Sequence, residues 1–150
     1  MEIASFSEIE TEFMARVSKV VWCNFASIDR KNRVRSRIVH PVWEHEIGWV
    51  TTRRDSFKGK HIGYSPYVSV SYVDAAKPLY IDCVAAWDDD LGDKQRIWEL
   101  CKSLTPPLGF DPAPIYKAFD DANFGLIKLM PWRIALNQFP AEPQIWRAPE

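Results

Sequence analysis

Short runs of β-branched and aromatic residues, separated by polar or proline-containing turns, recur through most of this sequence. The run from Tyr67 to Val73 alternates its side chains between two faces, as a strand with a period of two residues does. Similar runs span Val20 to Ile28, Arg33 to Val42, Ile47 to Thr52, Leu79 to Trp87, Phe124 to Met130 and Trp132 to Phe139. This pattern favours an antiparallel β-sheet or barrel over a helical fold or a parallel α/β fold.

Helical patterns lie between and before these runs. Apolar residues recur at three- and four-residue spacing from Ile3 to Val17, and a capping box of Ser5 with Glu8, or of Ser7 with Glu10, would start that helix. Further helices are expected at Arg53 to Gly63, opened by Asp55 or Ser56, at Gly92 to Leu104 behind three aspartates, and at Ile115 to Asp121. The order of elements therefore predicts one domain over residues 1–150, an antiparallel β-barrel with peripheral helices.

Charge and cysteine content exclude several classes of protein. The formal net charge is −1 and lacks the overall basic excess of a nucleic-acid binder. No stretch approaches the roughly 20 apolar residues that a membrane span needs, and Met1 to Val20 does not resemble a secretory signal. The three cysteines form no C-x-x-C pair, which favours a reducing cytoplasmic setting. Histidine and glutamate near residue 45 match no closed zinc pattern, so no metal site is predicted.

Cations gather in two neighbouring segments of this otherwise balanced chain: Arg30, Lys31, Arg33, Arg35 and Arg37, then Arg53, Arg54, Lys58 and Lys60. In a hairpin the Arg33–Val42 and Ile47–Thr52 strands would be neighbours. The second strand runs into a helix N-terminus that carries Ser56 and Lys58, and free N–H groups, a hydroxyl and cations make a monophosphate site. Arg37 would add a bidentate guanidinium. The alternative is that the arginines line the solvated face of an exposed hairpin.

These motifs resemble the FMN-binding split barrel of the pyridoxamine 5′-phosphate oxidase family. The resemblance rests on Arg37-x-Val39 in one strand, Thr51-Thr52 ending the next, Ser56-x-Lys58 opening a helix, and Trp146-Arg147 near the end of the chain. It implies a six- to seven-stranded antiparallel split β-barrel, mainly β with peripheral helices. It also implies a homodimer that holds FMN at the subunit interface and acts on a small-molecule substrate.

The resemblance also assigns roles to residues of this chain. Arg37 would contact the flavin phosphate or ribityl chain, and the backbone at Ile38 and Val39 would face the isoalloxazine ring. Thr51 and Thr52 would contact the phosphate or the edge of the flavin ring, and Ser56 and Lys58 would contact the phosphate. Trp146 would either pack on the flavin or anchor the tail to the partner subunit.

Two departures from the family pattern change what is expected of the protein. The residue before Lys58 is typically Arg in the oxidases and is Phe57 here, so Lys60 or Arg54 would have to supply the missing cation. The Arg-x-His motif of the oxidases is missing from Pro131 to Leu136, which argues against pyridoxamine phosphate oxidase activity. The prediction is an FMN-dependent oxidoreductase of unidentified substrate. The alternatives are a deazaflavin-dependent reductase and a non-catalytic flavin-binding sensor or stress protein.

Overall fold

The computed structural model describes residues Met1 to Glu150 and is dominated by strands. The strands are β1 (Glu2–Ile3), β2 (Cys23–Ile28), β3 (Val34–Val39), β4 (Val42–Glu44), β5 (Ile47–Arg53), β6 (Tyr67–Tyr72), β7 (Leu79–Trp87), β8 (Phe124–Gln138) and β9 (Ala141–Arg147). The helices are the 3-10 turn η1 (Phe6–Glu8), α1 (Glu10–Lys19), α2 (Phe57–Tyr64), α3 (Leu91–Ser103) and α4 (Ala113–Tyr116). None of the helices is long and apolar enough to cross a membrane. A mainly β fold with peripheral helices is therefore confirmed.

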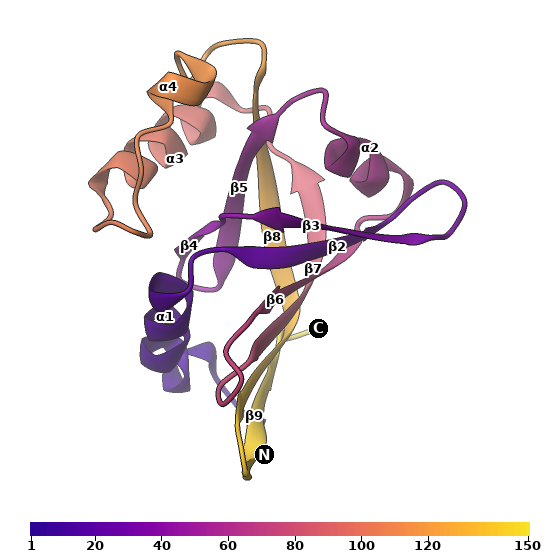
Figure 1. Cartoon of the computed structure of the whole chain (residues 1–150), viewed down its shortest axis with the longest axis vertical. Coiled ribbons are helices and arrows are strands. Elements are labelled where there is room, and N and C mark those ends of the chain that lie inside the picture. Colours follow the sequence, from indigo (N-terminus) through magenta and orange to yellow (C-terminus); the bar gives the residue numbers. More distant parts are fainter.

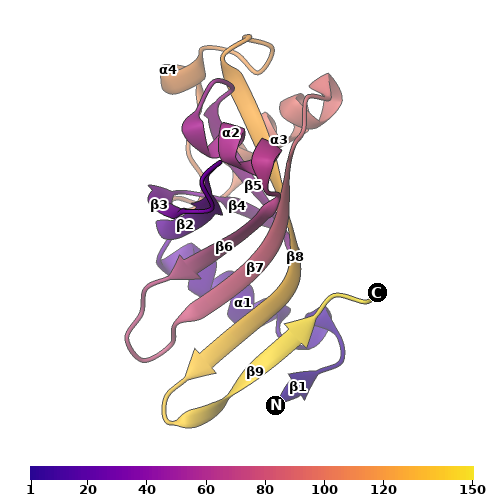
Figure 2. The ribbon, with the colours of Figure 1, turned by 90° about the vertical axis from the view of Figure 1, so that its right-hand side faces the viewer.

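Seven strands form one antiparallel path in the order β3, β2, β6, β7, β8, β5 and β4. Strands β3 and β4 end the path and do not pair with each other, so the barrel stays split. The long strand β8 pairs with β5 through its first half and with β9 through its second half, and β1 adds to β9 in parallel. Figure 2 shows β9 and β1 extending the sheet beyond β8. The sheet thus has nine strands, where six to seven were predicted.

The strand expected from Val20 begins only at Cys23. Two further strand boundaries were predicted wrongly, and both of these errors involve a proline. The strand expected to reach Val42 ends at Val39, because Pro41 has no N–H and restricts His40 before it; β4 then starts separately. As a result β3 pairs only with β2, and the predicted β3–β5 hairpin does not exist. Conversely, the two strands expected on either side of Pro131 are the single strand β8. A register shift between Asp82 and Cys83 of β7 absorbs the proline there.

Several helices and the C-terminal segment can also be compared with the prediction. The Ser5–Glu8 capping box is present, but it caps the short turn η1, and the regular helix α1 begins only at Glu10. The expected helix from Ile115 to Asp121 is the shorter α4, which ends at Tyr116, before Lys117, whose φ is +71°. The segment Ala141–Arg147, for which no strand was predicted, forms β9. The N-cap positions of α2 and α3 are Ser56 and Asp90.

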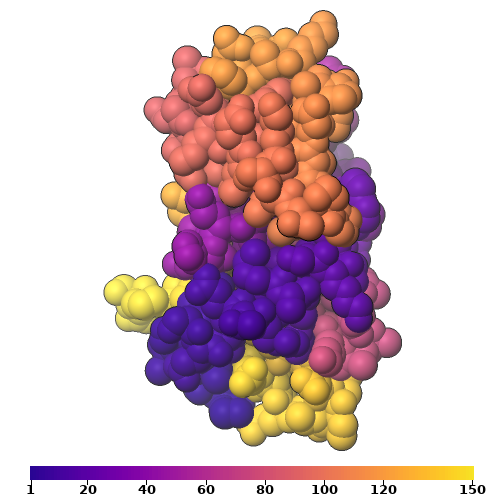
Figure 3. All heavy atoms as spheres, turned by 90° about the vertical axis from the view of Figure 1, so that its left-hand side faces the viewer, coloured from indigo at the N-terminus to yellow at the C-terminus, as the bar shows by residue number.

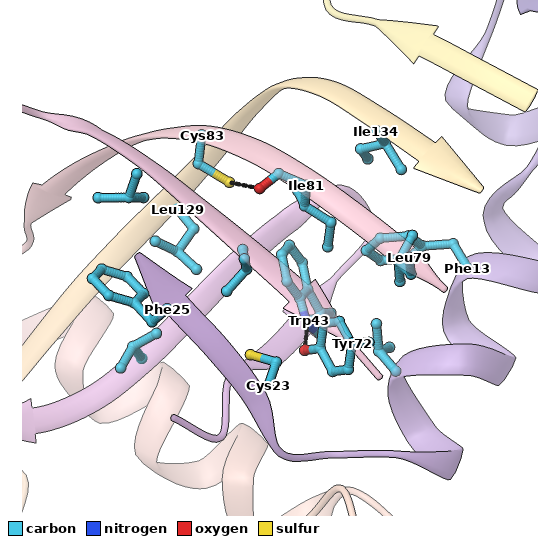
Figure 4. Packing of buried hydrophobic residues seen from close by; sticks show 14 of the residues in the cluster. Phe13, Cys23, Phe25, Trp43, Tyr72, Leu79, Ile81, Cys83, Leu129 and Ile134 are labelled. Atoms are coloured by element: carbon cyan, nitrogen blue, oxygen red, sulfur yellow. Dashed lines mark hydrogen bonds between the residues drawn. The ribbon is translucent and has the colours of Figure 1, made fainter. Parts of the chain in front are cut away.

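The main core lies inside the barrel and contains a hydrogen bond between two buried aromatic side chains (Figure 4). The Trp43 Nε1–H donates to the Tyr72 hydroxyl oxygen over 2.7 Å, and both side chains are buried. Phe13 of α1 packs edge-on against Trp43 with ring centroids 5.1 Å apart. Burial raises the pKa of the nearby Cys23 thiol to about 12, and all three cysteines are free and buried. The thiols therefore act as apolar core groups.

Tyr72→Phe is expected to destabilise the protein by about 1–3 kcal/mol, because it leaves the buried Trp43 N–H without an acceptor. Urea unfolding monitored by tryptophan fluorescence would measure the change. The matched control is Tyr80→Phe, since Tyr80 is 42% exposed and lies on the neighbouring strand β7. It should shift the free energy of unfolding by less than about 0.5 kcal/mol. Equal effects in the two variants would show that the Trp43–Tyr72 bond contributes nothing.

Candidate functional site

A cavity of about 930 Å³ lies where the end of β3, the end of β5 and the start of α2 face the segment around α4. This volume is in the range of small-molecule and cofactor sites. Helices α3 and α4 lie on one side of this part of the sheet and α2 on the other, with β5 and β8 between them (Figure 1). The cavity is lined by Trp22, Ile38, Val39, His40, Thr51, Thr52, Arg53, Asp55, Ser56, Phe57, Lys58, Phe110, Asp111, Pro114, Ile115 and Tyr116.

One wall of the cavity is the N-terminus of α2. Ser56 is its N-cap, and its hydroxyl accepts a hydrogen bond from the Gly59 N–H over 3.3 Å. The Lys58 ammonium donates to the Thr52 hydroxyl over 2.7 Å. Burial and the nearby Arg37 both lower the pKa of Lys58. A positive charge that is partly withdrawn from water, beside helix N–H groups, favours binding of an anion at this wall.

Arg37 lies next to this wall on β3. It pairs across the strands with Phe25, whose side chain is fully buried, so Arg37 points to the inner face of the sheet. Its Nε is buried and has no hydrogen-bond partner. Burial, and then the neighbouring Arg35, lower the pKa of the guanidinium. A buried, unpaired cationic donor costs free energy, and an acceptor such as a phosphate oxygen would remove that cost.

The Trp87 side chain fixes where α2 sits. A Cβ added at Gly59 of α2 would lie 1.9 Å from Trp87 Cζ2, and one at Gly125 of β8 would lie 2.6 Å from Trp87 Cζ3. The indole therefore fills the space between two glycines, and no larger residue fits at either position. Arg54 covers the ring with its guanidinium 4.1 Å from the centroid and is held by Asp89 over 2.9 and 3.1 Å.

The wall opposite α2 comes from the segment between α3 and β8. His40 Nε2 lies 2.9 Å from the Leu108 carbonyl oxygen, and burial lowers the pKa of the imidazole, so a neutral His40 donates through Nε2–H. The imidazole also lies between the Trp22 and Phe110 rings, with centroids 5.2 and 5.0 Å away. In Figure 3 this segment, in salmon and orange, lies directly on the early strands in indigo and violet. His40 thus holds the segment around Leu108 and Phe110 over the cavity.

Comparison with known proteins identifies the fold. No family model matches the sequence, and no curated protein matches it. Among solved structures, a NimC/NimA family protein from Clostridium acetobutylicum has a TM-score of 0.77 at 15% identity, covering 95% of this chain and 94% of its own. A pyridoxamine 5′-phosphate oxidase-related, FMN-binding protein from Nostoc punctiforme has a TM-score of 0.64 at 16% identity, covering 94% and 87%. The fold is the pyridoxamine 5′-phosphate oxidase-like split barrel. HutZ, the heme storage protein of Vibrio cholerae, shares it with a TM-score of 0.62 at 18% identity, covering 82% and 89%.

In this split barrel most of the residues singled out from the sequence come together. The cavity is lined by Ile38, Val39, Thr51, Thr52, Ser56 and Lys58, and the charge of Arg37 acts on Lys58. Trp146 is placed elsewhere: it is 5% exposed and packs on Phe6 in the core of its own chain, with centroids 5.6 Å apart. Neither role expected of Trp146, at the flavin or on the partner subunit, is supported by this position.

Several residues of the site were not predicted from the sequence. The cation that lines the cavity besides Lys58 is Arg53, whereas Arg54 is held by Asp89 and Lys60 lines a different pocket. Trp22, His40, Phe110 and Tyr116 were not recognised as lining residues. The one available signal was the apolar character of the proline-rich loop around Leu108 and Phe110, which is unusual for a solvated linker.

Proposed function

We propose that the cavity of this split barrel binds FMN and that the protein is a flavin oxidoreductase. The observation that carries the proposal is a group of donors at one end of the cavity, formed by lining residues and by Arg37, which lies beside the cavity without lining it. Arg37 has a buried Nε without a partner, Lys58 is partly buried, and the N-terminus of α2 opens at Ser56. A phosphate monoester satisfies all three, because it brings negative charge and several acceptor oxygens to one point.

The remaining lining residues suit the flavin ring. Ile38 and Val39 would place the β3 backbone along the isoalloxazine, while Phe110 and Tyr116 would cover it with aromatic surface. Burial raises the pKa of Tyr116 by more than the contact of its hydroxyl with Thr51 lowers it, so the phenol stays protonated. Bound FMN would supply hydride or electron transfer to a small-molecule substrate. Arg37 and Lys58 would hold the phosphate and orient the ring, and His40 would keep the cover in place.

The open side of the cavity suggests how the site is completed. Trp22, Ile38, Phe57 and Ile115 line the cavity and are 61%, 60%, 71% and 66% exposed, which is an unusual amount of apolar surface at one site. Strand β3 also has one unpaired edge beside them. We propose that a second copy covers this surface in a two-fold homodimer with FMN at the interface. The three free cysteines favour a cytoplasmic location for this dimer.

Titration of the purified protein with FMN, followed by flavin fluorescence, tests the proposal. Saturable binding of FMN is expected, with weaker binding of riboflavin because it lacks the phosphate that Arg37 and Lys58 would hold. Equal binding of the two would contradict the phosphate site, and binding of neither would contradict a flavin site altogether. Reduction of the bound flavin by nicotinamide nucleotides in a stopped-flow instrument, followed by reoxidation with an acceptor, separates an oxidoreductase from a non-catalytic sensor.

A further inference from the structure

The segment that covers the flavin cavity contains a backbone conformation that is rare outside glycine. Lys117 has a φ of +71° and a ψ of −59°, and the Ala118 N–H donates to the Tyr116 carbonyl oxygen over 2.9 Å. These dihedral angles and this hydrogen bond define the strained form of the γ-turn. Lys117 is exposed, so packing of its own side chain does not impose the turn. Strained backbone of this kind persists only where neighbouring contacts determine it.

The contacts of the preceding residue hold the turn. The Tyr116 ring packs edge-on against Phe124, with centroids 5.1 Å apart, and Phe124 is fully buried. The Tyr116 N–H donates to the Pro112 carbonyl oxygen over 3.0 Å and so keeps the residue at the last position of α4. The strained turn and this packing together fix where the Tyr116 side chain lies.

The phenol of Tyr116 lines the cavity beside Thr51, near the end of β5. Successive side chains of β5 point to opposite faces of the sheet, so Thr52 faces Lys58 of α2 and Thr51 faces α4. Thr51 lowers the pKa of Tyr116, which is the effect of a hydrogen bond donated to the phenol oxygen. Burial raises that pKa by more, so the phenol keeps its proton and can donate a hydrogen bond to a ligand.

Charge is distributed unevenly along the cavity. We call the part formed by the segment around α4 the α4 end, which is lined by Phe110, Asp111, Pro114, Ile115 and Tyr116. Asp111 is the one ionised residue among these five, and its carboxylate accepts from the Ala113 N–H over 3.0 Å. The other carboxylate that lines the cavity, Asp55, lies 3.3 Å from Arg53, which neutralises it. The α4 end therefore carries a net negative charge, and the phosphate-binding cations lie at the opposite end.

The α4 end also offers room and apolar surface. The cavity volume of about 930 Å³ is near the upper limit of about 1,000 Å³ for small-molecule sites, so a second small ring fits beside a bound flavin. Phe110 and Tyr116 present aromatic surface to such a ring and favour a planar one. A carboxylate or phosphate on that ring would lie near Asp111 without a free cation, because the flavin phosphate would occupy Arg37 and Lys58. Burying such a charge costs free energy.

We propose that the α4 end is the substrate site and that Tyr116 determines its specificity, by donating a hydrogen bond from its phenol to an uncharged, planar substrate that carries an acceptor oxygen. The inference rests on the proposed function, because the substrate would lie between Tyr116 and a bound flavin. The strained turn at Lys117 holds the phenol where the acceptor oxygen binds. The substrate class is thus an aromatic amide or carbonyl compound, not a phosphorylated or carboxylated ring.

Two probes of equal size test the proposal in the FMN-saturated protein. Nicotinamide is an uncharged planar ring with an acceptor oxygen, and nicotinate has a carboxylate in place of the amide. Changes in the absorbance of the bound flavin measure the affinity for each probe without any turnover. Nicotinamide is expected to bind at least about fivefold more tightly than nicotinate, because the carboxylate would be buried without a cation. Tyr116→Phe keeps the ring on Phe124 and should weaken nicotinamide binding roughly two- to tenfold, the effect of one neutral hydrogen bond.

Two variants of Lys117 separate the turn from the charge of its side chain. Lys117→Gly removes the ammonium but adopts a positive φ freely, so it should keep the wild-type affinity for nicotinamide and melt a few degrees higher. Lys117→Val also removes the ammonium, but a β-branched residue resists a positive φ. Tyr116 should then move, and the affinity should fall as it does in Tyr116→Phe. The control is Tyr64→Phe, at an exposed hydroxyl outside the cavity, which should leave the affinity unchanged.

Each part of the inference has a result that would overturn it. Nicotinate binding as tightly as nicotinamide would contradict an uncharged substrate, and wild-type affinity in Tyr116→Phe would contradict the role of Tyr116. Equal affinities in Lys117→Gly and Lys117→Val would show that the turn does not position the phenol. Saturable FMN binding with no binding of either probe would overturn the inference and leave the proposed function intact. Failure of FMN to bind would overturn both.

Discussion

Gly59→Ala is expected to destabilise the protein by about 1–3 kcal/mol and to weaken FMN binding strongly. The new Cβ would lie 1.9 Å from Trp87 Cζ2, far inside contact distance. The indole has no space to withdraw, because Gly125 of β8 contacts its other side and Arg54 covers its face. Helix α2 would therefore move outward and carry Ser56 and Lys58 away from the phosphate position. Urea unfolding and FMN titration measure the two effects.

Gly63→Ala in the same helix is the matched control. No atom lies within 4 Å of a Cβ built there, and the backbone of Gly63 is not in the left-handed region. Because alanine restricts the unfolded chain more than glycine does, this variant should be as stable as the wild type or up to about 1 kcal/mol more stable. It should bind FMN normally. Similar behaviour of the two variants would show that Trp87 does not determine the position of α2.

Local sequence signals predicted the elements that depend on a few neighbouring residues. Ser56 and Asp90 act as N-caps, as their side-chain chemistry suggested, and the alternating run at Tyr67 forms β6. The errors occur where a distant contact decides the outcome. Pro131 appeared to divide two strands, but the bulge opposite Asp82 and Cys83 of β7 accommodates it, and that partner lies about fifty residues earlier in the chain.

The candidate site shows the same division between local and distant information. Ser56, Lys58 and Thr52 lie within seven residues of one another, and their proximity followed from a strand running into a helix. The packing of Leu108 and Phe110 on His40 joins segments about seventy residues apart, and no periodicity in either segment encodes it. The role predicted for Trp146 has a related explanation. An aromatic ring suits a ligand site, but the Trp146 ring packs on Phe6 in the core, and this contact joins the two ends of the chain.

Lys58→Ala is expected to weaken FMN binding by about 1.5–3 kcal/mol, roughly ten- to a hundredfold in the dissociation constant. The Lys58 ammonium is the cation held at the cavity by Thr52, and its loss would leave the phosphate with Arg37 and the helix N-terminus. Isothermal titration with FMN measures the change. Riboflavin, which has no phosphate, should bind the wild type and the variant with nearly equal affinity.

Lys60→Ala, two residues further along α2, is the control, because Lys60 lies outside the flavin cavity and should alter FMN binding less than about twofold. The pH dependence gives a second readout. Burial and Arg37 lower the pKa of Lys58 below the ordinary lysine value, so Lys58 loses its charge at a lower pH than an exposed lysine does. Wild-type affinity for FMN should fall as pH rises through that pKa, and the fall should be absent in Lys58→Ala. An alanine variant with wild-type affinity and an unchanged pH profile would remove Lys58 from the site and leave Arg37 as the main phosphate contact.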